Sequence, residues 1–383
     1  MTRPYENIKI LDLTHVLAGP FSTYQFALLG AEVIKIESPE NPDCARGRGP
    51  DPKLNADLRG LNYQVQAANK KAMTLDLKQE MGQQIFKKMV LDADVLVENY
   101  RTGALDQLGL GYDDLKSINP RLIYCSLSGF GNYGDRATVN AYDNTIQATS
   151  GIIEQSNGHK PGVSFVDYAA GYNAAFAISA ALHQRIMTGV GTQISSSMLE
   201  VAMTLMAPEA AAAQHPVKTK RDKEAGISAY ETADGILMIG AFTPDQNRRM
   251  WEMFEELNID FAAELKAPND WESLWAISKV TKEQVAKILK DKSADEWQRI
   301  FHQYGLPAEK QRTLSEAIHD PQLHNYYYEE EGIILPKAAY HFENGPEIKT
   351  PPPGFSEHTD EILLTLGYSD EDNSNFREAG IIK

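Results

Sequence analysis

Short apolar runs alternate with segments of helical spacing along roughly the first 130 residues. The apolar runs are typical of strands buried on both faces, and they occupy 8–13, 32–36, 73–77, 95–98 and 122–127. Apolar positions at helical spacing predict helices between them, at 21–29, 80–91 and 112–118. Strands that alternate with helices in this way indicate an α/β fold with an open, mostly parallel sheet, similar to a Rossmann domain.

An alanine-rich helix is the central feature of the next segment. A β-favouring run at 163–166 precedes it, and we expect the helix to begin at Asp167 and to end near Arg185, before Gly189. Its many small residues would let other backbone or a bulky ligand approach closely. Further predicted elements are a polar helix at 140–151, a strand at 192–194 and an apolar helix at 197–206.

The chain changes in composition after residue 214. The stretch 215–226, HPVKTKRDKEAG, is charged and poor in apolar residues, which is typical of a linker. Residues 227–320 predict a smaller α+β domain, with two strands in 228–241 and helices at 247–257, 271–277, 282–289 and 294–304. Residues 321–383 read as a linker and a tail with a proline-rich segment and one helix. Residues 1–214 therefore form the predicted large domain, to which the tail could return.

Composition excludes several classes of protein. The chain has 383 residues, of which 42% are hydrophobic and 23% charged, as in an ordinary globular protein. Its net charge of −16 argues against a nucleic-acid partner or an anionic membrane surface. Two cysteines, no signal-peptide pattern and no long apolar stretch predict a cytoplasmic protein without a membrane span. The nine histidines are scattered without metal-ligand spacing, so we expect no metal site.

Polar side chains follow several of the predicted strands. Lys78, Asn99 and Arg101 come after strands whose carboxyl ends should share one edge of the sheet, where they could converge on an anionic ligand. Three arginines of the predicted loop 41–60 are further phosphate candidates: Arg46, Arg48 and Arg59. No GxGxxG follows the first strand, which argues against a dinucleotide.

Asp167 has two interpretations at the start of its helix. As an N-cap, its carboxylate would accept the free N–H groups of the first turn. As a nucleophile, it would be kept ionised by the same helix end and presented to a substrate. The local sequence leaves both open.

Several long motifs, taken in order, resemble the class III coenzyme A transferases, the group that includes formyl-CoA transferase and carnitine CoA-transferase. The motifs are LDLTHVLAGPFSTYQFALLGAEVIKIE at 11–37, NKKAMTLDLK at 69–78, VENYRTGALDQLGLGYDDLKSINPRLIYCSLSGFG at 97–131, and the Asp167 helix. Shorter similarities in the C-terminal part are YETADGILMIG at 230–240 and SEHTDEILLTLGYS at 356–369.

The resemblance implies a fold, an assembly and a reaction. The large domain would combine the N-terminal half with the returning tail, the active site would lie between the two domains, and two chains would interlock as a homodimer. Asp167 matches the catalytic aspartate, which attacks an acyl-CoA thioester to give an aspartyl anhydride and then an aspartyl-CoA thioester, from which a carboxylic acid takes the CoA. No tightly bound cofactor is implied. The CoA and substrate contacts carry over onto His15, Leu75, Lys78, Asn99, Tyr100 and Tyr142, with Arg46 and Arg101 as phosphate partners.

Departures from the family pattern bear on specificity. Leu17 stands where formyl-CoA transferase has glutamine, and Ser38 where it has a basic residue, so oxalate is not the expected acid. One alternative is an α-methylacyl-CoA racemase, which needs a histidine where this chain has Tyr142; tyrosine is a poor base at neutral pH. A second alternative is a non-catalytic acyl-CoA-binding protein.

Overall fold

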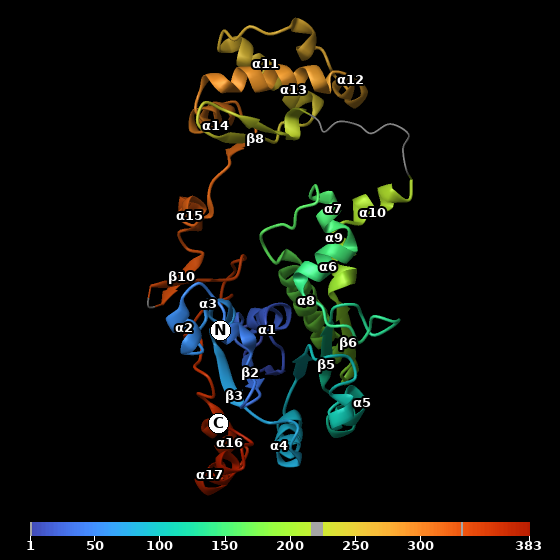
Figure 1. Ribbon diagram of the computed structural model, residues 1–383, viewed down its shortest axis with the longest axis vertical. Helices are drawn as coiled ribbons and strands as arrows, with labels where there is room; N and C mark the ends of the chain where they lie inside the picture. Colours follow the sequence, from blue (N-terminus) through green and yellow to red (C-terminus); the bar gives the residue numbers. More distant parts are fainter. Residues whose placement is uncertain (1, 216–224, 331) are drawn as a thin grey trace. The chain divides into compact units, whose positions relative to one another are not determined.

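The computed structural model describes residues 2–215, 225–330 and 332–383 (Figure 1), so that most of the predicted linker lies outside the described residues. The chain separates into two compact units. One consists of Met1–Gln214 together with Asn325–Lys383, and the other of His215–His324. Each unit is described by itself.

The first unit contains a six-stranded sheet in the order β3-β2-β1-β4-β5-β6, in which all neighbours are parallel. Its strands are β1 (Lys9–Asp12), β2 (Glu32–Glu37), β3 (Lys70–Thr74), β4 (Val95–Glu98), β5 (Ile123–Ser128) and β6 (Gln193–Ser197). The predicted α/β class is confirmed. The prediction for β3 was wrong by three residues, because the strand begins at two lysines that an apolar pattern does not mark.

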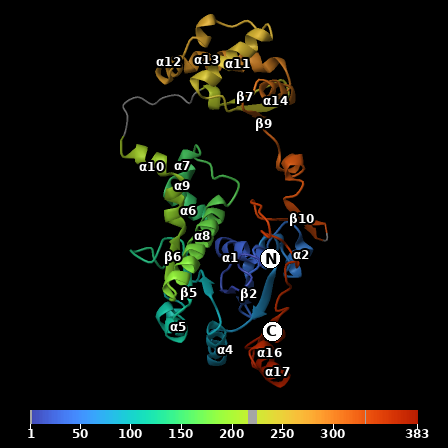
Figure 2. The ribbon, with the colours of Figure 1, turned by 180° about the vertical axis from the view of Figure 1, so that it is seen from behind.

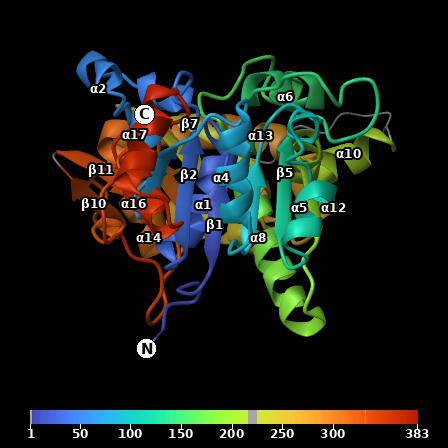
Figure 3. The same cartoon turned by 90° about the horizontal axis from the view of Figure 1, so that it is seen from below.

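Strands β1 to β5 are buried on both faces along almost their whole length, as their apolar runs predict, whereas the first half of the edge strand β6 is exposed. Leu11 of β1 lies between Ile34 of β2 and Leu96 of β4, and these side chains join the core beneath α4 and α5. Ile10 lies between Val33 and Val95 and joins the opposite core, beneath α1, α8 and α9. Figure 3 shows α4 and α5 on one side of the strands and α1 and α8 on the other. The helices of this unit that lie before residue 215 are α1 (Ala18–Leu28), α2 (Pro52–Ala56), α3 (Leu61–Gln64), α4 (Glu80–Val90), α5 (Tyr112–Ile118), α6 (Asp143–Ser150), α7 (Ile152–Gln155), α8 (Phe165–Thr188), α9 (Met198–Leu205) and α10 (Ala207–Ala213).

Helices α1 and α8 pack closely against one another (Figure 2). A Cβ atom at Gly171 of α8 would lie 2.7 Å from the carbonyl oxygen of Ala18 and 2.8 Å from the Phe21 ring. Glycine is therefore required at this crossing. The small residues of α8 serve, in part, to bring two helices together.

The C-terminal tail packs onto β3. The Asp76 N–H donates to the carbonyl of Ile381 at 2.8 Å, and the Lys383 N–H donates to the hydroxyl of Thr74 at 2.9 Å. The tail has a hairpin of β10 (Tyr327–Glu330) and β11 (Ile333–Pro336), then α16 (Thr359–Thr365) and α17 (Asp370–Glu378). The single predicted helix is thus two helices, because Gly367 between them adopts a positive φ of 86°.

The second unit is a three-stranded antiparallel sheet covered by helices, with a core around Trp251, Phe254, Trp297 and Phe301. Its strands are β7 (Ala229–Glu231), β8 (Ile236–Ile239) and β9 (Ala308–Lys310), and its helices are α11 (Pro244–Glu256), α12 (Trp271–Ala276), α13 (Ser278–Ile288), α14 (Ala294–Gln303) and α15 (Leu314–Ala317). Strand β9 was not predicted, because three residues are too few to show a period. Among the helices of the described residues, none is long and apolar enough to cross a bilayer.

Candidate active site

A cavity of about 370 Å³ opens at the carboxyl ends of β1, β4 and β5. The strand order reverses between β1 and β4, and open α/β sheets bind their ligands at such switch points. Every residue that lines the cavity belongs to the first unit. Six of the nine predicted site residues are among them: His15, Asn99, Tyr100, Arg101, Tyr142 and Asp167.

Asn99 joins the loop after β1 to the loop after β4. Its side-chain carbonyl accepts the His15 N–H at 2.9 Å, and its amide donates to the His15 carbonyl at 3.0 Å. This pair of hydrogen bonds fixes the backbone that carries His15 into the cavity. Burial, together with the nearby ammonium of Lys35, lowers the pKa of His15. The cavity therefore presents a neutral imidazole at physiological pH.

Asp167 lies in the first turn of α8, which begins at Phe165. The predicted strand at 163–166 was wrong, because 165 and 166 already belong to the helix. The N-cap position is held by Ser164, whose side chain makes no capping hydrogen bond. The interpretation of Asp167 as an N-cap was therefore wrong as well, and its carboxylate lines the cavity instead.

Asp143, at the start of α6, occupies the capping role at the N-terminus of α8. Its Oδ1 accepts the N–H of Val166 at 3.0 Å and that of Asp167 at 3.4 Å. The Lys160 ammonium lies 3.7 Å from the same carboxylate, and Gln147 donates to it at 2.5 Å. The amides that would have stabilised a charge on Asp167 are thus directed to a second carboxylate.

The environment of Asp167 disfavours its charge. Burial, followed by repulsion from Asp143, raises the pKa of Asp167 from 3.8 to about 7, although Lys160 opposes the change. A carboxylate in this position is poorly solvated and more reactive than an ordinary aspartate, yet it is substantially ionised near neutral pH.

Arg46 lies away from the cavity, and its predicted role as a phosphate partner is corrected by its contacts. The guanidinium is fully buried, donates to the Glu37 carboxylate at 2.8 to 3.0 Å, and donates to the Tyr63 hydroxyl at 2.7 Å. Its remaining nitrogen faces the carbonyls of Leu58 and Pro353. No N–H is left for a phosphate, so Arg46 is a structural cation.

Leu75 and Lys78 also lie outside the residues that line the cavity. Leu75 is buried in the core beneath α4, and Lys78 is exposed after β3. Their contacts with CoA stay predictions.

The sequence reasoning missed Asp143 and Lys160 as parts of the site. Asp143 follows Tyr142 directly, but a residue inside a predicted polar helix gives no sign that it caps another helix. Within the residues that the structure describes, no group of three or more histidine, cysteine or carboxylate side chains is placed to hold a metal ion.

Comparisons with known proteins agree with this architecture. The model of CoA-transferase family III matches residues 5–359. Human succinyl-CoA:glutarate CoA-transferase is 30% identical over 412 aligned positions, which cover 99% of this chain and 90% of that protein. Acetyl-CoA:oxalate CoA-transferase of Acetobacter aceti is 30% identical over 353 positions, 87% of each chain.

A solved structure is similar over almost the whole chain. The crystal structure of a CaiB/BaiF family protein from Brucella suis superposes with a TM-score of 0.81 at 26% identity, covering 96% of this chain and 100% of that one. The resemblance drawn from the motifs is confirmed, and the chain belongs to CoA-transferase family III.

Proposed function

We propose that this protein moves CoA from a short acyl-CoA thioester to a carboxylic acid and that Asp167 is the nucleophile. The observation that carries the proposal is the position of Asp167. It is the one carboxylate among the described residues that line the cavity, and it reaches the cavity from the first turn of α8. The names of the relatives support short acyl groups as donors, since they include succinyl-CoA and acetyl-CoA.

The reaction proceeds through three covalent intermediates, an anhydride, a thioester and a second anhydride. The Asp167 carboxylate attacks the thioester carbonyl, the carbon–sulfur bond breaks, and an acyl-aspartyl anhydride and CoA thiolate form. The thiolate attacks the aspartyl carbonyl, which releases the first acid as a carboxylate and leaves an aspartyl-CoA thioester. The acceptor carboxylate attacks this thioester and forms a second anhydride, and the returning thiolate takes the acceptor acyl group and frees Asp167.

The site contributes positioning and electrostatics. An unperturbed carboxylate is a weak nucleophile, and partial desolvation of Asp167 raises its reactivity without keeping it protonated at pH 8. Each tetrahedral intermediate carries an oxyanion, for which the backbone beside Ser128 and Gly129 in the cavity wall offers candidate donors. Exclusion of water would prevent hydrolysis of the anhydride.

Intact-protein mass spectrometry tests the proposal. The protein is incubated with succinyl-, acetyl- and formyl-CoA, with and without hydroxylamine, beside the Asp167→Asn variant. We expect a mass gain that hydroxylamine removes, that maps to Asp167 and that the variant lacks. Deuterium exchange beside the thioester without any adduct would favour the racemase, and CoA binding without either would favour a non-catalytic protein.

A pH profile tests the environment of Asp167. The nucleophile must be ionised, so kcat/KM is expected to fall as the pH drops through about 7, the pKa of Asp167. Asp143→Asn keeps the oxygen that caps α8 but removes a negative charge, so the acid limb should move to lower pH. The fraction of plateau activity at about pH 5.5 should therefore rise severalfold. An unchanged acid limb would show that Asp143 does not influence Asp167.

We also propose the interlocked homodimer that the family resemblance implies. Helix α8 exposes large apolar side chains that a folded monomer would leave in water: Phe176 at 76%, Ile186 at 80% and Met187 at 76%. A second copy would supply the cover for this face.

A further inference from the structure

The loop between β1 and α1 contains a residue in an unfavourable backbone conformation. Val16 has a φ of +68°, in the left-handed region that β-branched residues rarely adopt. Such a conformation persists only where the surroundings enforce it. Its energetic cost disfavours it against an ordinary backbone conformation by about 10-fold to 100-fold in the equilibrium constant. Four consecutive residues, 15–18, line the cavity, so the conformation of Val16 sets the shape of one wall.

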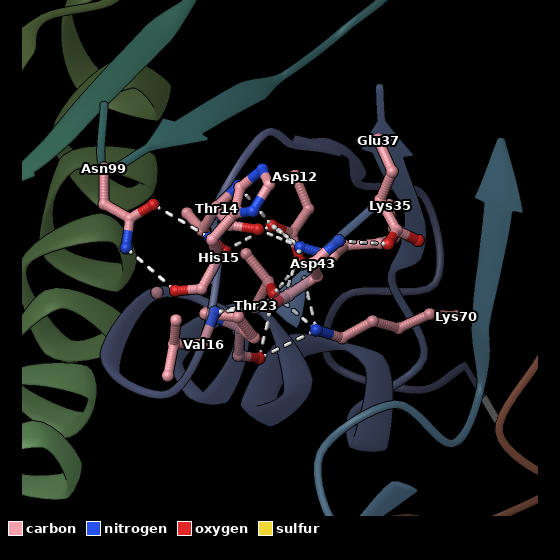
Figure 4. A network of polar contacts seen from close by, with 12 residues as sticks. Asp12, Thr14, His15, Val16, Thr23, Lys35, Glu37, Asp43, Lys70 and Asn99 are labelled. Atoms are coloured by element: carbon pink, nitrogen blue, oxygen red, sulfur yellow. Dashed lines mark hydrogen bonds and ion pairs between the residues drawn. The ribbon is translucent and has the colours of Figure 1, made fainter. Parts of the chain in front are cut away.

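Polar groups hold both ends of the Val16 residue. The Asp43 carboxylate accepts the Val16 N–H with both oxygens, at 2.9 and 3.1 Å. The Gln66 amide donates to the Val16 carbonyl, and Lys35 donates to the carbonyl of Thr14. Figure 4 shows Asn99 on one side of the loop and the charged groups converging on the other. The loop is thus fixed by side chains from several separate segments.

Asp43 is in turn fixed by a buried and electrically balanced network. Its carboxylate lies 3.2 Å from the Lys35 ammonium and accepts the Ala45 N–H at 3.0 Å. Its own N–H donates to Glu37 at 2.9 Å. Although burial favours the neutral acid, Lys35 and the surrounding N–H groups hold the pKa of Asp43 below its ordinary value.

The same network continues beneath α1. The Lys70 ammonium lies 3.0 Å from Asp12 and donates to the Pro20 carbonyl at 2.7 Å. Three buried acids therefore face three buried bases, which are Asp12, Glu37 and Asp43 with Lys35, Arg46 and Lys70. Full pairing makes such a cluster rigid, because displacement of any member leaves a buried charge.

We propose that Asp43 is a positioning residue for CoA binding: it holds Val16 in the left-handed conformation and so keeps the wall from His15 to Ala18 in its binding shape. The inference rests on the proposed function, in which this cavity receives the CoA thioester. Asp43 acts through the loop and does not itself line the cavity.

Isothermal titration with free coenzyme A tests the inference. Asp43→Asn keeps an oxygen that can accept the Val16 N–H, but the hydrogen bond is weaker than that to a carboxylate. We expect the Kd for CoA to rise about 10-fold. Glycine adopts the left-handed conformation without strain, so Val16→Gly in the Asp43→Asn protein should return the Kd to that of Val16→Gly alone. With a thioester that the wild type turns over, KM should follow the same pattern while kcat changes little. A role confined to stability would give no such rescue.

Asp94→Asn is the matched control. Asp94 is partly buried, accepts the Lys9 N–H at 2.8 Å and pairs with the buried Arg185 at 2.7 Å, but it precedes β4 and lies away from the cavity. This variant should lose stability and keep its Kd. If Asp43→Asn does not fold, Gln66→Met replaces it, because this change removes the hydrogen bond to the Val16 carbonyl without leaving a charge unpaired. It should show the same rise in Kd and the same rescue by Val16→Gly.

Two results would overturn the inference. One is a Kd within about twofold of the wild type in folded Asp43→Asn or Gln66→Met, since that change is too small to reflect the strain at Val16. The other is a weakened Kd that Val16→Gly does not restore. A wild-type protein that binds no CoA would instead overturn the proposed function, and the inference with it.

Discussion

Replacing Asp167 with asparagine is expected to abolish CoA transfer and to make the folded protein more stable at pH 8. The amide is nearly isosteric but cannot form the anhydride, so kcat should fall by about 1,000-fold or more. The stability gain has a different origin. Asp167 has a pKa of about 7 in the folded protein against 3.8 as its ordinary value, so folding is penalised once the group is ionised.

The size and the pH dependence of this gain follow from linkage. A carboxyl whose folded pKa is raised costs nothing while it is protonated in both states, and the cost grows as pH rises from about 4 to about 7. The full difference between the folded and ordinary pKa values of Asp167 corresponds to about 4 kcal/mol. Partial solvation of Asp167 reduces the expected gain in stability to about 2 kcal/mol. Urea unfolding of the wild type and Asp167→Asn at pH 8 and pH 5 measures it, and the gain should be smaller at pH 5.

A control separates this effect from a general loss of negative charge. Asp92→Asn removes an exposed carboxylate from the turn that follows α4 and should change neither activity nor stability. If Asp167→Asn proves less stable than the wild type at pH 8, the carboxylate makes favourable contacts that contradict its assignment as a desolvated nucleophile.

Arg46→Met is expected to destabilise the protein by about 3 to 5 kcal/mol, because it leaves the buried Glu37 carboxylate without its counter-ion. Removing both charges in Arg46→Met/Glu37→Gln should recover much of this loss, since no unpaired charge remains. Urea unfolding of the wild type, the single variants and the double variant measures the recovery as a coupling energy.

Arg101→Met is compared with Arg46→Met to show which of the two arginines binds a phosphate. Arg101 is exposed and lines the cavity, so its loss should raise the KM for the thioester and leave the free energy of unfolding almost unchanged. The KM of folded Arg46→Met should change less than that of Arg101→Met. A stable Arg46→Met protein with a larger increase in KM would restore Arg46 as a phosphate partner.

The sequence by itself determined the class of fold, the family and much of the cavity. Continuous apolar runs such as 95–98 predict strands buried on both faces, and β4 occupies those four residues. The carboxyl ends of neighbouring parallel strands meet at one edge, which is why the sequence alone assigns Asn99 and Arg101 to a common site. The ordered motifs placed Asp167 in the family pattern.

Only the tertiary structure decided what surrounds each charge. Strand β3 starts at Lys70 because its ammonium meets Asp12, 58 positions earlier, and Arg46 is structural because its carboxylate partner, Glu37, is buried with it. Asp167 lines the cavity and is not a cap because Asp143 accepts the amides of its helix. A local pattern records which face of an element is buried, whereas counter-ions, desolvation and strain depend on segments that are brought together only when the chain folds.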